Sequence, residues 1–209
     1  MSGPTLHTNR LVLATHNKHK AEELQAMLRD AGIDVLALDA FPGVGAIEED
    51  QETLEGNARK KAREVFRQTA LAALADDTGL EVDALGGKPG VHSSRFAGPN
   101  ASYTENVTTL LQELSGIPPE RRTARFRCVL AFVAADGVEH VVEGVCHGRI
   151  LEQPRGEGGF GYDPIFLPQG YDLSFAEMPM ELKNTISHRA QALKKMRQVL
   201  LEYFGRERR

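Results

Sequence analysis

The stretch "RLVLATHNKHKAEELQAMLRDAGIDVLAL", residues 10–38, decides the class of fold. Its first part, "RLVLAT", predicts a buried strand, and "IDVLAL", residues 33–38, predicts a second strand. Between them, apolar residues recur at helical spacing from Ala21 to Ala31, and Gly32 ends the expected helix. A strand, a helix and a strand in this order form a βαβ unit, so the sequence predicts an α/β fold.

The rest of the chain continues this alternation of helices, strands and loops. The further expected elements are helices at 54–66 and 101–114, strands at 80–85 and on both sides of the Asp136-Gly137 turn, and a last helix capped by Ser187. Two long glycine-rich loops, residues 86–100 and 154–164, separate some of them. Because no repeat or linker interrupts the 209 residues, we expect a single α/β domain over 1–209, with two lobes flanking a cleft.

Composition places the chain among ordinary globular proteins and argues against several partners. Hydrophobic residues make up 41% and charged residues 26%, and the net charge of -4 offers no general surface for nucleic acid or membranes. Cys128 and Cys146 form neither a disulfide framework nor a zinc motif, and both are expected to be buried thiols. Residues 1–10 lack the apolar core of a signal peptide, and no run is long enough to span a membrane. We therefore expect a cytoplasmic protein.

Two adjacent acids, Asp76 and Asp77, follow an apolar run in "ADDTGL", residues 75–80. One interpretation is a turn, because Asp, Thr and Gly are good turn formers. The other is a strand end that holds a cation, since a buried charge is costly unless it is paired or binds a metal. If the strand continues through the two acids, their side chains face opposite ways and can have different roles.

The segment "THNKHK", residues 15–20, lies where the first strand gives way to the first helix. Backbone N–H groups at such a helix start bind anions, phosphates in particular, and the hydroxyl, amide and lysine side chains add donors. A polar loop before an exposed helix would give the same pattern. His16 and His19 lie three residues apart without a third ligand nearby, which argues against zinc.

A second acidic cluster, "IEED" at residues 47–50, is explained by a solvated loop or by a metal site shared with Asp76 and Asp77. Mg²⁺ takes oxygen ligands, typically one or two carboxylates together with substrate phosphates and water. Two acidic clusters beside a phosphate-binding turn would supply that set.

Two further motifs carry groups suited to nucleotides. Arg189, in "SHR", has a planar fork of donors that suits a carbonyl or phosphate, although capping and a surface ion pair explain it equally. The rings of "FGYD", residues 160–163, would stack on a base or cover the core. The nearby match to G-x-G-x-x-G, residues 156–161, is not a dinucleotide fingerprint, because Pro154 precedes it and no helix opens within it.

In this order, "THNKHK", "ADDTGL", "GGKPGVHSSRFAG", "GFGYDPIF" and "SHRAQAL" resemble the successive motifs of the inosine/xanthosine triphosphate pyrophosphatases. The resemblance runs from about residue 10 to residue 204. It implies an elongated mixed β-sheet flanked by helices, two lobes with a central cleft, and a homodimer. It also implies Mg²⁺-dependent hydrolysis of ITP, dITP and XTP to the monophosphate and pyrophosphate, which removes damaged purine nucleotides from the precursor pool.

The same resemblance implies roles for individual residues. Asp77 would be the catalytic acid residue, and Glu48 would be its partner around Mg²⁺, with Glu49 as the rival. The substrate-binding residues would be Thr15, His16, Asn17, Lys18, His19, Lys20, Lys61, Thr78, Phe160, Gly161, Tyr162, Asp163, Lys183, His188 and Arg189.

The chain departs from many members of that family at three positions, without putting the reaction in doubt. His16, Thr78 and Ser94 stand where many members have Gly, Ser and Ala. Two rival functions remain at this point: a pyrophosphatase for other nucleotides, and a nucleotide-binding regulatory protein without turnover. Adjacent acids argue against the regulatory protein, because carboxylates repel phosphates unless a metal intervenes. A nucleic-acid-binding module is disfavoured by the negative charge.

Overall fold

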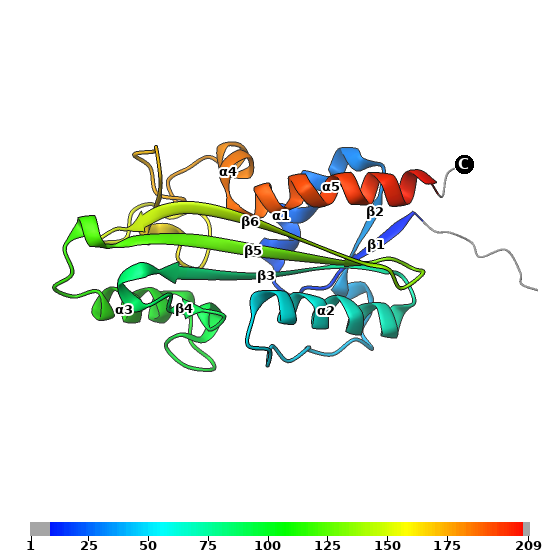
Figure 1. Cartoon of the computed structure of the whole chain (residues 1–209), viewed down its shortest axis with the longest axis horizontal. Helices are drawn as coiled ribbons and strands as arrows, with labels where there is room; N and C mark the ends of the chain where they lie inside the picture. Colours follow the sequence, from blue (N-terminus) through cyan, green and yellow to red (C-terminus); the bar gives the residue numbers. More distant parts are fainter. Residues whose placement is uncertain (1–8, 207–209) are drawn as a thin grey trace, which may run out of the picture.

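One mixed sheet runs along the long axis of the molecule in this computed structural model, which describes residues 9–206 (Figure 1). Its strands follow the order β2-β1-β3-β5-β6-β7, with β4 paired to β3. The strands are β1 (Arg10–Leu13), β2 (Asp34–Ala37), β3 (Ala72–Val82), β4 (Pro89–Gly90), β5 (Thr123–Val133), β6 (Glu139–Ile150) and β7 (Phe166–Pro168). β1 is parallel to β2 and β3, and every other pairing is antiparallel. The predicted α/β class with a mixed sheet is confirmed.

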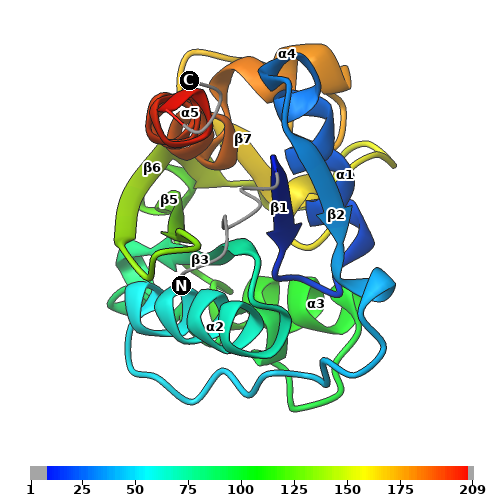
Figure 2. The ribbon, with the colours of Figure 1, turned by 90° about the vertical axis from the view of Figure 1, so that its right-hand side faces the viewer.

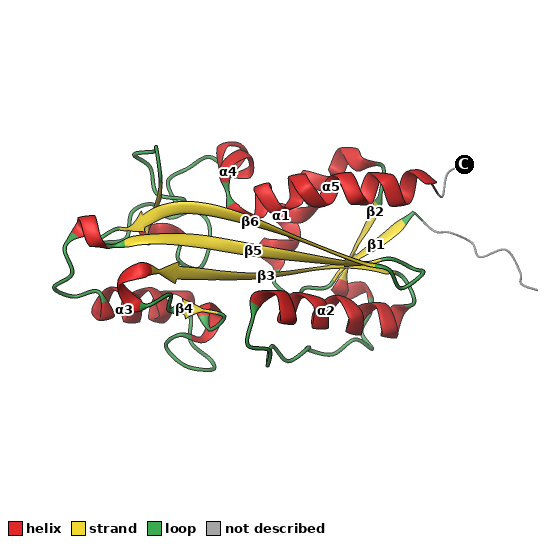
Figure 3. Cartoon of the chain, in the orientation of Figure 1, coloured by secondary structure: helices red, strands yellow, loops and turns green. Residues whose placement is uncertain are grey.

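Helices cover both faces of this sheet (Figures 2 and 3). They are α1 (Lys18–Leu28), α2 (Leu54–Thr69), α3 (Tyr103–Glu113), α4 (Met180–Ile186) and α5 (His188–Arg206). α1 and α5 share one apolar core, in which Leu24 and Met196 pack with Leu74 of β3. α2 packs on the opposite face, where Ala58 meets Ala73. A third core joins α3 to the far end of β3 and β5.

The βαβ unit forms as the sequence predicts, and local signals end its helix. Asn17 caps α1, because its side-chain oxygen accepts hydrogen bonds from the N–H groups of His19 and Lys20. A short 3₁₀ turn follows the helix, and Gly32 then adopts a left-handed conformation with φ 65°. Parallel β1 and β2 therefore place the residue 14–17 turn and the start of α1 at the carboxyl end of β1, where ligands of open α/β sheets bind.

The predicted hairpin is also confirmed. Gly137 has φ 84°, and the carboxylate of Asp136 accepts a hydrogen bond from the N–H of Val138, which closes the turn between β5 and β6. Ser187 caps α5, since its hydroxyl accepts a hydrogen bond from the N–H of Ala190. Short helix α4, which precedes Ser187, was not predicted.

The two expected placements of "ADDTGL", in a turn or at a strand end, are both wrong, because Asp76 and Asp77 lie in the middle of a strand. β3 is one continuous strand of 11 residues, and residues 73–82 pair with β5 without interruption. The separate strand expected at 80–85 is the end of β3 followed by the 3₁₀ turn Asp83–Leu85. β3 is buried on both faces, so its apolar residues run together rather than alternate, and the acids interrupt that run instead of ending it.

Two expectations from composition can be compared with the described residues. Cys128 and Cys146 are buried and free, as predicted. Within residues 9–206 no helix combines the length and the apolar character needed to cross a bilayer. Residues 1–8, which make up most of the stretch judged to lack a signal peptide, lie outside the described residues, as do residues 207–209.

Candidate functional site

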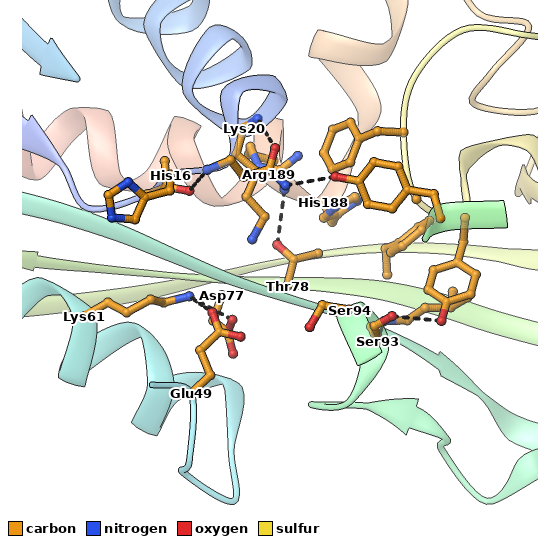
Figure 4. A pocket seen from close by; sticks show the side chains of 18 of the residues that line it. His16, Lys20, Glu49, Lys61, Asp77, Thr78, Ser93, Ser94, His188 and Arg189 are labelled. Carbon is orange, nitrogen blue, oxygen red and sulfur yellow. Dashed lines mark hydrogen bonds and ion pairs between the residues drawn. The ribbon is translucent and has the colours of Figure 1, made fainter. Parts of the chain in front are cut away.

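A cavity of about 300 Å³ opens beside the middle of β3 and gathers most of the residues singled out in the sequence (Figure 4). The predicted residues that line it are Thr15, His16, Asn17, Lys20, Lys61, Asp77, Thr78, Phe160, Gly161, Tyr162, Asp163, Lys183, His188 and Arg189. Lys18, His19 and Glu48 are exposed and do not line it, whereas Glu49 does. Segments far apart in sequence therefore converge on one cavity.

Asp77 faces α2 and shares a lysine with Glu49. The Lys61 ammonium lies 3.0 Å from an Asp77 oxygen and 2.5 Å from a Glu49 oxygen. Asn57, one turn earlier on α2, donates its amide N–H to the other Asp77 oxygen over 3.2 Å. Figure 4 shows Lys61, Asp77 and Glu49 grouped on one side of β3. In this arrangement a buried carboxylate, Asp77, and a half-buried one, Glu49, hold one cation.

Burial and charge act in opposite directions on this group. Burial raises the pKa of Asp77 above its usual value, although Lys61 and Lys20 pull it down. Burial alone would also lower the pKa of Lys61, but Asp77 and Glu49 raise it to about 12. For Glu49, burial raises the pKa, but Lys61 outweighs burial and the net shift is downward. Lys61 is thus firmly cationic, and Asp77 is a stronger base than an exposed aspartate.

Asp76 faces the other way and is fully paired with cations. The Lys20 ammonium lies 2.6 Å from one carboxylate oxygen, and the Arg189 guanidinium lies 3.1 Å from the other. Thr78 donates its hydroxyl to that second oxygen over 3.0 Å. Burial would raise the pKa of Asp76, but Lys20 and Arg189 outweigh it and hold the pKa well below its usual value. Asp76 is therefore a permanent anion that orients Lys20 and Arg189.

The sequence analysis did not identify Glu23, which connects the ion pairs of Asp76 to those at the opposite end of the cavity. Glu23 is buried on α1 and pairs with both Arg189 and Lys183. The Lys183 ammonium lies 2.9 Å from Glu23 and 2.7 Å from Asp163. The sequence did contain a signal for a buried charge at this position, because Glu23 lies beside Leu24 on the apolar side of the predicted helix. A charge at such a position needs a partner.

Asn57 and Arg95 were missed as well. Asn57 lies next to Ala58 on the apolar side of α2, which was the available signal. Arg95 comes from the glycine-rich loop and donates a hydrogen bond to the backbone carbonyl of Glu49 over 3.0 Å. No local pattern predicts that contact, because the two residues are distant in sequence.

The turn before α1 presents donors to the cavity. The Thr15 hydroxyl accepts the N–H of Asn17 over 3.1 Å, and Asn17 in turn caps α1. Lys20 lies in the first turn of the helix, with its side chain largely buried against Asp76. His16 points instead toward exposed Asp39, with 3.6 Å between the ring and the carboxylate. A helix start combined with Lys20 is suited to bind an anion.

The two rings of "FGYD" have different environments. Tyr162 is 4% exposed and donates its hydroxyl to the Ser93 carbonyl over 2.9 Å, so it covers the core as well as lining the cavity. Phe160 is half-buried at the cavity, and its N–H donates to the Asp163 carboxylate over 2.8 Å. Gly159 is required there, because a β-carbon would lie 2.2 Å from an Asp163 oxygen. Packing against Asp163 thus explains Gly159, which stands at a variable position of the G-x-G-x-x-G pattern.

His188 lines the cavity at the same end as Phe160 and Tyr162. Its ring stacks on Phe126 with centroids 4.6 Å apart and planes 18° from parallel. Burial lowers the pKa of His188 well below its usual value, and the neighbouring Arg189 and Lys183 lower it further. The ring is therefore neutral, and its buried Nδ1 has no hydrogen-bond partner among the described residues.

The carboxylates of the described residues do not form a complete metal cage. No group of three or more His, Cys, Asp and Glu side chains within residues 9–206 is arranged to hold a metal ion. Asp77 and Glu49 share the Lys61 ammonium at the cavity wall.

Comparison with known proteins gives a consistent result. The model of the Ham1 family matches residues 11–199. A "dITP/XTP pyrophosphatase" of Desulforamulus reducens is 51% identical over 191 residues, which cover 91% of this chain and 95% of that protein. The structure of a HAM1 protein from Coxiella burnetii superposes with a TM-score of 0.84 at 42% identity, covering 92% of this chain and 98% of the other. A Mycobacterium abscessus structure described as "Nucleoside-triphosphatase / dITP/XTP pyrophosphatase" gives a TM-score of 0.73 at 42% identity, covering 90% and 98%.

Proposed function

Since the chain belongs to the Ham1 family, we propose that it hydrolyses non-standard purine nucleoside triphosphates, ITP, dITP and XTP, to the monophosphate and pyrophosphate. One observation supports the proposal most directly. Asp77 and Glu49 share Lys61 on one wall of the cavity, and the first turn of α1 lies on the opposite wall. Carboxylates, ammonium groups and a helix start in one cavity suit a metal-bound triphosphate.

Asp77 and Glu49 would hold a divalent metal, for which we propose Mg²⁺. The donor set fits, because both side chains offer carboxylate oxygens and already stabilise the cationic charge of Lys61. Two carboxylates suffice, since Mg²⁺ commonly completes its ligands with substrate phosphates and water. When bound, the metal would neutralise charge on the phosphates. We propose Glu49 for this role in place of Glu48, which is exposed outside the cavity.

The chain's own cations would bind the three phosphates. Asn17 and Lys20 lie at the start of α1, and Lys61 lies on the facing wall. Lys20 and Lys61 are held by Asp76 and Asp77, so their ammonium groups are oriented before substrate arrives. Such preorganised charge favours a transition state in which negative charge builds up on the phosphate oxygens.

Asp77 would position a water molecule for attack at the α-phosphorus and accept its proton. Burial raises the pKa of this carboxyl, which makes it a better proton acceptor than an exposed aspartate. Asn57 donates to one oxygen of Asp77 and fixes the plane of the carboxylate. The Lys61 ammonium would remain protonated and stabilise the departing pyrophosphate.

The base would lie at the end of the cavity formed by Thr78, Phe160, Tyr162, His188 and Arg189. Hypoxanthine and xanthine have a 6-keto acceptor, whereas adenine has a 6-amino donor. A guanidinium or backbone N–H of the cavity can donate a hydrogen bond to the keto group. With adenine bound, the same protein donor would face another donor and remain unpaired. Each buried unpaired group costs about 1–3 kcal/mol, which is enough to disfavour ATP.

We further propose that the chain is a single-domain, cytoplasmic enzyme that works as a homodimer without nucleic-acid or membrane partners. Family membership and the net charge of -4 support this assignment. Its cellular task would be to remove damaged purine nucleotides before they enter nucleic acids.

The decisive experiment is a substrate panel. Purified protein with Mg²⁺ is incubated separately with ITP, dITP, XTP, GTP, ATP and dTTP, and the products are identified. Monophosphate and pyrophosphate, formed much faster from the first three substrates, are the expected result. Diphosphate and orthophosphate would mean attack at the γ-phosphorus and would overturn the mechanism. Equal turnover of every substrate would overturn the base selection.

A further inference from the structure

Tyr103, the first residue of α3, is a large exposed side chain at the rim of the cavity, and none of the roles above uses it. It lines the cavity and is 43% exposed. Its backbone is held firmly, because Ser102 and Glu105 form both halves of a capping box at the start of α3. Figure 2 shows α1 and α3 toward the same side of the molecule.

The hydroxyl of Tyr103 contacts the turn before α1. Asn17 donates its amide N–H to the Tyr103 oxygen over 3.2 Å. The carbonyl oxygen of the same Asn17 amide accepts the N–H groups of His19 and Lys20. Tyr103 therefore fixes which end of the amide faces α1, and with it the cap that aligns the N–H groups at the helix start.

The ring of Tyr103 contacts the glycine-rich loop. Its centroid lies 6.0 Å from that of Phe160, at an interplanar angle of 45°. Phe160 also stacks on His19, with centroids 5.3 Å apart and planes 12° from parallel. Three segments that are distant in sequence thus meet at the cavity rim through one aromatic group and one hydrogen bond. Aromatic pairs at such distances add to the stability of the arrangement beyond the area they bury.

We propose that Tyr103 is a positioning residue for the nucleotide, acting through Asn17 at the phosphate end and through Phe160 at the base end. The inference rests on the proposed function of the cavity as a nucleoside triphosphate site. Because Tyr103 contacts both ends at once, it sets the distance between the groups that would bind the phosphates and the ring beside the base. Its effect belongs to substrate binding rather than to the chemical step, since its contacts are with Asn17 and Phe160 rather than with Asp77.

The test measures KM and kcat for ITP in variants of Tyr103. Tyr103→Phe keeps the ring and removes the hydrogen bond, and we expect KM to rise about threefold with kcat unchanged. Tyr103→Ala removes both contacts, and we expect KM to rise about tenfold. Tyr171→Phe is the matched control, because Tyr171 is 37% exposed and lies outside the cavity. Its KM should equal that of the unmodified protein.

Asn17→Ala provides the test of action through Asn17. In that background Tyr103→Phe should have no further effect on KM, whereas independent effects would multiply. A merely structural role of Tyr103 would lower the active fraction, so kcat would fall while KM stayed constant, and that result would overturn the proposal. An unchanged KM in Tyr103→Phe would overturn it as well.

Failure of this inference is distinguishable from failure of the proposed function. If the unmodified protein hydrolyses ITP, Asp77→Asn abolishes that activity and Tyr103→Phe behaves as the control, only the positioning role of Tyr103 is wrong. If Asp77→Asn remains active, the assignment of the cavity itself is wrong.

Discussion

Asp76 and Asp77 are neighbours in sequence, yet their carboxylates bind different cations on opposite faces of β3. Asp76 contacts Lys20 and Arg189, whereas Asp77 contacts Lys61. The pKa of Asp76 is lowered and the pKa of Asp77 is raised, although both side chains are buried. Folding therefore stabilises the charge of Asp76 and opposes that of Asp77, in agreement with the proposal that Asp76 has a structural role and Asp77 a catalytic one.

Substitution of each aspartate by asparagine should separate these roles. Asp77→Asn removes the proton acceptor, and we expect kcat for ITP to fall on the order of 10²–10⁴-fold with little loss of thermal stability. Asp76→Asn removes the carboxylate that pairs with Lys20 and one of the two carboxylates that pair with Arg189, so its melting temperature should fall further than that of Asp77→Asn. Melting curves and single-substrate kinetics on both variants decide the matter. The opposite order of stabilities would refute the assignment.

The identity of the second metal-binding carboxylate can be decided by two neighbouring substitutions. Glu49→Gln should raise the Mg²⁺ concentration for half-maximal activity by about tenfold or more, because it removes a ligand beside Lys61. Glu48→Gln should leave that concentration unchanged, since Glu48 is exposed away from the cavity. Mg²⁺ titrations at fixed ITP give both values. An effect confined to Glu48→Gln would restore the role to Glu48.

Arg189 should matter for folding as much as for substrate. It is 1% exposed and pairs with Glu23 and Asp76, so Arg189→Ala leaves two buried carboxylates with less compensation. We expect a loss of about 3–5 kcal/mol in the free energy of unfolding, measured by urea denaturation. Arg155→Ala, which breaks an exposed ion pair with Glu177, is the control and should cost about 0.2–1 kcal/mol. Equal losses in the two variants would contradict this account.

Stability should depend on pH through His188. The folded protein holds this histidine neutral because burial lowers its pKa, whereas the unfolded chain protonates it below about pH 6.5. The unfolded state then binds the additional proton, so stability falls as pH drops below 6.5, by up to about 1.4 kcal/mol per pH unit from this group.

His188→Phe removes the titrating group and keeps a ring against Phe126. The slope of unfolding free energy against pH should therefore be shallower in this variant between pH 5 and 6.5, and the two slopes should agree between pH 7 and 8. Identical slopes in the acidic range would mean that folding does not lower the pKa of His188.

The local elements of the fold could be predicted because they depend on near neighbours in sequence. The helical spacing of apolar residues predicted α1, Gly32 predicted where the helical segment ends, and Asp136-Gly137 predicted the hairpin. The ordered motifs likewise predicted segments that line the cavity. Prediction was wrong at β3, because a strand buried on both faces has no alternating pattern and its paired acids resemble a turn.

The sequence by itself determined the α/β class, the caps and turns, and most of the residues that line the cavity, since these follow from periodicity, from backbone chemistry and from motif order. Only the tertiary structure decided which side chains form ion pairs and hydrogen bonds with one another. Glu23 reaches Lys183 and Arg189, Glu49 rather than Glu48 reaches Lys61, and Tyr103 reaches Asn17. These partners lie far apart in the chain, and the low dielectric of a buried site makes each pairing depend on position to within a few ångströms, which no local pattern encodes.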